Sequence, residues 1–170
     1  MKQAKILFDK SLYAQVEKTL NKAEELCSKY EKYIYHMEII RWRKKIVYSS
    51  SIFSKIEEEQ ISCLYKEEKR ISELVDNQNE YWHLNGLMYF QYKTLGVARL
   101  EEDIEKYNFF KTHPNIINKE LAKSYYAKLH FFWIHLHYCL VTANLNGDIL
   151  LCKRTGRFYR SPPTPGRRKP

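Results

Sequence analysis

The sequence predicts an all-α fold in which about seven helices stack as antiparallel hairpins joined by short connections. Glycine and proline are scarce, with 5 of each among 170 residues, which disfavours a turn-rich β fold. Apolar residues recur at three- and four-residue steps, as they do along one face of a helix. No segment shows the alternation typical of a strand, so we expect helices throughout the body of the chain.

The first predicted hairpin has the clearest helical period of the chain. Apolar residues recur on one face through residues 13–30, a shorter helix precedes them around residues 6–8, and residues 10–12 fit a tight joint. Residues 32–50 carry apolar side chains on more than one face, which is typical of a helix packed between two neighbours.

A capping box opens the next predicted helix. The Ser54 hydroxyl is expected to accept a hydrogen bond from the third amide of the helix while Glu57 reaches back to the Ser54 amide. This helix is predicted over residues 54–78, and a separate one over residues 82–95 before Gly96.

The last part of the body contains one strong break. A short helix is predicted over residues 101–110, and Pro114 interrupts the chain because proline lacks an amide donor and disfavours helix before it. Asn118 is a suitable N-cap for the last helix, which carries two apolar stripes and ends at residues 146–148. We expect both stripes to be buried.

The C-terminal residues differ from the body in charge. The whole chain has 29 basic and 20 acidic residues, whereas residues 1–150 hold 22 basic and 20 acidic ones. We therefore expect a helical domain over residues 1–148 and a disordered basic tail over residues 149–170. The seven basic residues after position 150 are Lys153, Arg154, Arg157, Arg160, Arg167, Arg168 and Lys169.

The tail has three competing interpretations. It is a basic arm whose arginines contact phosphates, or a polyproline segment over residues 161–165, or the product of a shifted reading frame. The change from a lysine-rich body to an arginine- and proline-rich tail motivates the third, which would leave the last helix uncovered and prone to self-association. The predicted phosphate contacts are Arg154, Arg157, Arg160, Arg167 and Arg168.

Two stretches of the chain share a repeat-like spacing. The first comprises Ala4, Leu7, Ser11, Tyr13, Val16, Leu20 and Ala23, and the second, partial one comprises Leu136, Leu140, Ala143, Gly147 and Ile149. This spacing resembles the tetratricopeptide repeat family, whose helix–turn–helix unit places small residues at interhelical contacts. In the first match Ser11 occupies the position usually given to glycine, and the signature tryptophan and the closing proline are absent. The resemblance implies an α–α superhelix that binds proteins or peptides through a concave face.

No residue pattern indicates chemistry. His130 and His137 share a helix face but are separated by about 10 Å along the axis, too far for one zinc ion. His135 and Cys139 form an i,i+4 pair without a glycine-rich turn or an oxyanion hole. We therefore expect no catalytic residues, no metal and no cofactor, and a chain that is not an enzyme.

The sequence thus favours a non-enzymatic scaffold that binds an unidentified protein or peptide. The alternative is a nucleic-acid-binding protein that uses the basic tail. Four scattered cysteines without a CxxC pair and the lack of a long apolar segment predict a cytoplasmic chain that does not enter a membrane. The candidate partner-binding residues are Arg41, Trp42 and Arg43 from a basic–aromatic cluster, and Tyr89 and Tyr92 from an aromatic helix.

Overall fold

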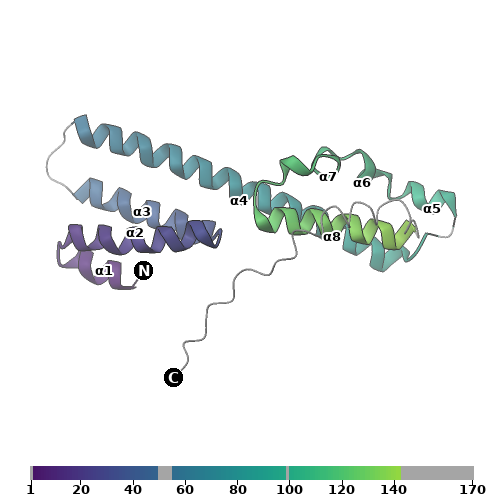
Figure 1. Ribbon diagram of the computed structural model, residues 1–170, viewed down its shortest axis with the longest axis horizontal. Helices are drawn as coiled ribbons and strands as arrows, with labels where there is room; N and C mark the ends of the chain where they lie inside the picture. The colour runs from purple at the N-terminus through teal and green to yellow at the C-terminus, as the bar shows by residue number, and fades with distance from the viewer. Residues whose placement is uncertain (1, 50–54, 99, 143–170) are drawn as a thin grey trace, which may run out of the picture. The chain divides into compact units, whose positions relative to one another are not determined.

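The computed structural model describes residues 2–49, 55–98 and 100–142, and these residues form helices and no strands. The predicted all-α class is therefore confirmed (Figure 1). The described residues divide into a first compact unit, residues 2–80 with 123–125, and a second, residues 81–122 with 126–142.

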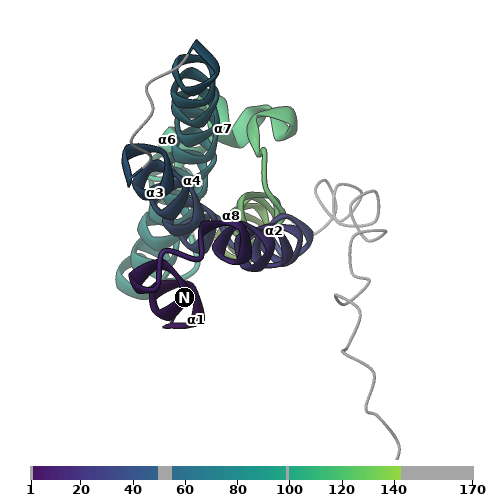
Figure 2. The same cartoon turned by 90° about the vertical axis from the view of Figure 1, so that its left-hand side faces the viewer.

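The first unit consists of three helices and the beginning of a fourth. They are α1 (Lys2–Asp9), α2 (Tyr13–Lys29), α3 (Tyr33–Ser49) and the first part of α4 (Lys55–Leu95). Consecutive helices run in opposite directions (Figure 1), as the sequence predicted for stacked hairpins, and Figure 2 shows the same helices viewed nearly end-on. The buried core residues are Ala4, Val16, Leu20, Cys27 and Ile39, with Leu7, Phe8, Ala23, Trp42 and Ile46 packed against them.

Ser11 closes the joint between α1 and α2 in a left-handed conformation with φ 57°. The Ser11 amide donates to the Phe8 carbonyl at 2.8 Å, and the Leu12 amide donates to the Leu7 carbonyl at 3.0 Å. This is the Schellman arrangement that commonly ends a helix, and it usually places glycine at the left-handed residue. The position that the repeat resemblance assigned to a glycine slot therefore has the backbone that glycine prefers.

Replacing Ser11 with glycine is expected to raise the free energy of unfolding by about 0.5–1 kcal/mol, because a left-handed conformation disfavours a side chain. Chemical denaturation measures the change. Ser28→Gly is the matched control, since Ser28 is exposed within α2 and glycine there should destabilise the helix. Equal destabilisation by both substitutions would contradict the geometry at Ser11.

The prediction of two helices over 54–78 and 82–95 is corrected, because α4 is one helix of 41 residues. Residues 78–80 contain neither glycine nor proline, so nothing in the local sequence forces a break. The Asn77 side chain accepts the Lys123 amide at 3.0 Å, and Tyr81 is fully buried. The proposed cap at Ser54 lies outside the described residues.

The second unit contains the end of α4 and a series of short helices before α8 (Tyr125–Thr142). The helix predicted over 101–110 is divided in two, and Pro114 occupies the first turn of its own short helix. Asn118 is a cap, as predicted, but of a single 3-10 turn: its side chain accepts the Glu120 amide at 3.0 Å. The short elements are α5 (Glu101–Glu105), α6 (Asn108–Thr112), α7 (Pro114–Ile117) and η1 (Lys119–Leu121).

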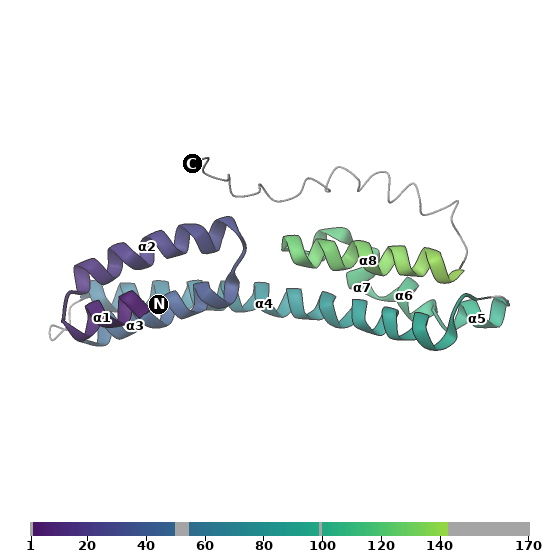
Figure 3. The ribbon, with the colours of Figure 1, turned by 90° about the horizontal axis from the view of Figure 1, so that it is seen from below.

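Within the second unit, α4 and α8 run in the same direction, which differs from the expected antiparallel hairpin. Figures 1 and 3 show α8 alongside the end of α4. Tyr81 contacts Phe131, and further along both helices Tyr89 contacts His137. The short helices between α4 and α8 carry the chain back from the C-terminal end of α4, so that α8 can run parallel to α4. The core residues are Tyr81, Leu84, Met88, Tyr107, Phe110, Ile116, Ala122, Ala127, Phe131, Ile134 and Val141.

One face of α8 is buried rather than both stripes. Phe131, Ile134 and Val141 are buried, whereas Tyr125 and Leu140 are 42% and 43% exposed. Phe131 is therefore a core residue. The end of the predicted last helix and the whole basic tail lie outside the described residues.

Candidate functional site

Four rings from α4 and α8 form a cluster in the second unit. The His137 ring lies 5.7 Å from Tyr89, 6.1 Å from Tyr92 and 6.0 Å from Trp133, measured between ring centroids. The Lys93 ammonium lies 5.4 Å from the Tyr89 ring centroid and 5.8 Å from that of Tyr92. The candidates Tyr89 and Tyr92 therefore lie together, and each contributes to a cation–π contact.

Burial favours the neutral form of two histidines in the second unit. It lowers the pKa of both His130 and His137 below the ordinary value of 6.5. The Asn85 amide lies 3.3 Å from His130 Nδ1, and His137 Nδ1 is buried without a hydrogen-bond partner among the described residues. Below pH 6.5, these two histidines bind protons more readily in the unfolded chain than in the folded chain. The second unit therefore loses stability as the pH falls.

Several large side chains of α4 are exposed. Trp82 and Phe90 are 64% and 65% exposed, Tyr89 is 48% exposed and Leu87 is 38% exposed. Trp82, Gly86 and Phe90 follow each other at four-residue steps, which places them on one side of a helix at about 40° intervals. We call Trp82, Gly86, Leu87, Tyr89 and Phe90 the α4 aromatic face.

The sequence located the aromatic helix but not its exposed side. Tyr81 is fully buried and Tyr92 is half-buried, while Trp82 and Phe90 are exposed. Aromatic residues occur around the whole helix, so periodicity alone does not separate the two sides.

The basic–aromatic cluster of α3 divides into exposed and internal members. Arg41 is exposed. Trp42 is half-buried with its ring 5.6 Å from Phe8, and the Lys45 ammonium lies 4.6 Å from its centroid. Of the three candidates in this cluster, Arg41 alone is exposed.

Arg43 is held by acidic side chains of α2. Its guanidinium donates two hydrogen bonds of 2.8 Å to the Glu24 carboxylate and one of 2.7 Å to Asn21 Oδ1. The Arg43 hydrogen bond holds the pKa of Glu24 below its ordinary value. Buried His36 lies 3.1 Å from Glu24 and 3.5 Å from Glu67 of α4. Arg43 therefore serves to join the helices of the first unit.

Arg43→Gln is expected to lower the free energy of unfolding at neutral pH by about 1–2 kcal/mol, because the Glu24 carboxylate loses its charged donor. The stabilisation is present above pH 4.5, the ordinary pKa of this carboxyl, and is lost as the pH falls through its lower folded-state value. Urea denaturation between pH 7 and 3 should therefore show a weaker acid dependence in Arg43→Gln. Arg41→Gln is the control, and an equal effect there would contradict the assigned role.

The described residues contain no group of three or more His, Cys, Asp or Glu side chains arranged to hold a metal ion. His135 and Cys139 do not form an exposed pair: His135 Nδ1 lies 2.8 Å from the Phe131 carbonyl oxygen, and Cys139 is buried. None of the helices in this part of the chain has the length and apolar character needed to cross a bilayer.

Comparisons with known proteins identify no relative. No protein-family model matches the chain, and neither a curated protein nor a solved structure matches it. The function must therefore be inferred from the chemistry of the residues described above.

Proposed function

We propose that the chain is a non-enzymatic helical scaffold that binds a protein or peptide through the α4 aromatic face. The observation that carries this proposal is the exposure of Trp82 and Phe90, each about two-thirds accessible on one side of a well-packed helix. The core of the second unit lies on the opposite side of α4 and includes Leu84 and Met88.

Aromatic side chains suit such a surface for energetic reasons. Tryptophan and tyrosine dominate binding hot spots because they remove a large apolar area from water while few rotatable bonds are immobilised. Exposed apolar residues are common one at a time, but a contiguous set on one helix face is typical of an interaction site. The face is rigidly held because α4 also supplies the buried residues Tyr81, Leu84 and Met88.

We also propose that the first unit is related to tetratricopeptide repeats and that the chain is cytoplasmic. The antiparallel α1–α2 and α2–α3 hairpins support the first proposal, as does the left-handed Ser11 at the glycine slot. Neither proposal is needed for binding through α4.

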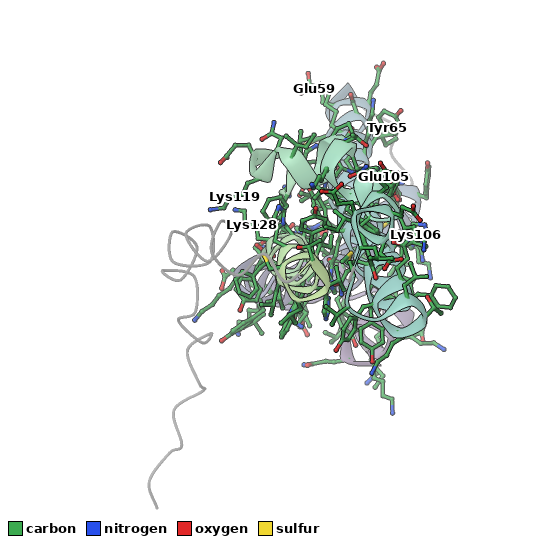
Figure 4. The ribbon with its side chains drawn as sticks, turned by 90° about the vertical axis from the view of Figure 1, so that its right-hand side faces the viewer. Glu59, Tyr65, Glu105, Lys106, Lys119 and Lys128 are labelled. Carbon is green, nitrogen blue, oxygen red and sulfur yellow. The ribbon has the colours of Figure 1, made fainter. Side chains whose placement is uncertain are left out.

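A photoreactive amino acid at position 90 tests the proposed surface. When the cells that make this protein are illuminated, we expect the amino acid at position 90 to form covalent adducts with a partner protein, because its side chain faces that partner. The same amino acid at position 105 is the matched control: Glu105 is exposed in the second unit but lies on α5 (Figure 4). Absence of adducts at position 90, or equal adducts at position 105, would reject the proposal.

Nucleic-acid binding through the tail is a second candidate function, favoured by the seven basic residues after position 150 and the absence of acidic ones there. Deleting residues 151–170 is then expected to abolish binding to DNA or RNA, and the affinity of the full chain should fall steeply with salt. Fluorescence anisotropy with a labelled oligonucleotide measures both. Equal binding by the truncated chain would exclude this function.

A further inference from the structure

No contact among the described residues explains the glycine at position 86. It lies in the interior of α4, where glycine lowers helix stability relative to alanine. A Cβ atom at this position would meet no atom within 4 Å, so the folding of the described residues does not require glycine here. Glycine also permits the close approach of another backbone, and the space around Gly86 leaves room for one.

The surroundings of Gly86 are symmetric along the helix. Trp82 lies four residues before it and Phe90 four residues after it, with exposures of 64% and 65%. If two copies of α4 cross antiparallel with Gly86 on the two-fold axis, Trp82 of each copy lies opposite Phe90 of the other. The contact between Trp82 of one copy and Phe90 of the other is then made twice, once on each side of the axis, as an isologous interface requires.

The charges of the face are compatible with this register. Between Asn79 and Thr94, the acidic and basic side chains of α4 are Glu80 and Lys93, and antiparallel pairing about Gly86 places Glu80 opposite Tyr92 of the other copy. Because Lys93 and Asn79 are each seven residues from Gly86, antiparallel pairing places Lys93 opposite Asn79 of the other copy. Like charges therefore do not meet across the interface.

We propose that a second copy of this chain docks on the α4 aromatic face, with the two α4 helices antiparallel and in contact at Gly86. The inference rests on the proposed function, since it names the occupant of that surface. Gly86 lets the two backbones approach, while Trp82 and Phe90 from each copy bury one another on either side of the axis.

Sedimentation equilibrium of the full chain tests the proposal. We expect a dimer whose dissociation constant rises at least tenfold in Gly86→Ala and further in Trp82→Ala/Phe90→Ala. Gly86→Ala should at the same time raise the melting temperature of the dilute, monomeric chain by about 2–4 °C, because alanine favours the helix. Ile117→Ala is the control for exposed apolar area, since Ile117 is 65% exposed in the second unit but lies outside α4.

Cysteine cross-linking tests the register. With Cys63 and Cys152 replaced by serine, an equal mixture of Trp82→Cys and Phe90→Cys chains should form a disulfide-linked dimer on mild oxidation. Each variant alone should form much less, because position 82 of one copy faces position 90 of the other. In a dimer of one variant, each new cysteine therefore faces an aromatic side chain instead of a second cysteine.

Three results would overturn the inference: a monomer at all concentrations, a dimer that survives Trp82→Ala/Phe90→Ala, or a dissociation constant unchanged by Gly86→Ala. A monomer whose position-90 photoprobe still captures another protein would reject self-pairing while leaving the proposed function in place. A monomer whose photoprobe gives no adduct would reject both.

Discussion

Phe131→Ala is expected to lower the free energy of unfolding by about 3–5 kcal/mol. Phe131 is 4% exposed, and its ring centroid lies 6.4 Å from that of Tyr81 and 4.3 Å from that of His135. The substitution removes a large apolar side chain from the core shared by α4 and α8, and a helical backbone cannot collapse fully into the cavity. Urea denaturation followed by circular dichroism measures the loss.

Phe132→Ala is the matched control for this prediction. It removes the same side chain from the same helix one residue later, where the phenylalanine is only half-buried. We expect a cost of about 1–2 kcal/mol because less apolar area returns to water. If the two substitutions destabilised the chain equally, the assigned orientation of α8 would be wrong.

Asn79→Pro is expected to lower the free energy of unfolding by about 3 kcal/mol or more. Position 79 lies inside α4, so proline removes a helical hydrogen bond and its ring clashes with the preceding turn. The sequence instead suggested a joint between residues 78 and 82, where a proline is tolerated. The substitution therefore distinguishes a continuous helix from two helices.

Asn79→Ala supplies the comparison at the same position. Asn79 is exposed, and alanine has the higher helix propensity, so stability should be unchanged or slightly increased. A proline variant as stable as the alanine variant would show that the chain is not helical at this point.

The N-terminal hairpins were predictable because their signals are local. Val16 and Leu20 recur on one face of α2 and are fully buried, and the joint at Ser11 lies where the apolar period is interrupted. Even in these hairpins, tertiary contacts determine whether an individual residue is buried. Leu26 continues the apolar stripe but is 58% exposed, whereas the neighbouring Cys27 is buried.

The arrangement of the second unit was not predictable from local signals. Asn79 is a weak helix former, but α4 continues through it because buried residues such as Ile71 and Tyr81 anchor the helix on both sides. Asn118 is a good cap in sequence and a cap in the structure, yet the helix it begins lasts a single turn. A capping residue identifies where a helix begins but carries little information on its length.

The candidate residues show the same limit. Tyr89 and Tyr92 lie in one cluster, as their helical spacing allowed, but the positions of His137 and Trp133 depend on how α8 packs. Arg43 lies in a basic segment that is typical of a surface. Its ion pair with Glu24 joins residues 19 positions apart and forms only when α2 and α3 pack together.

The central claim is that the folded chain leaves the α4 aromatic face open for a partner. Acrylamide quenching of a chain with Trp42→Phe and Trp133→Phe, studied at high dilution, reports on Trp82 alone. We predict that acrylamide quenches Trp82 nearly as efficiently as in the urea-unfolded chain, whereas Trp133, retained as the single tryptophan in a matched variant, is protected. A Trp82 as protected as Trp133 would mean that the chain covers this face itself, and would contradict the account.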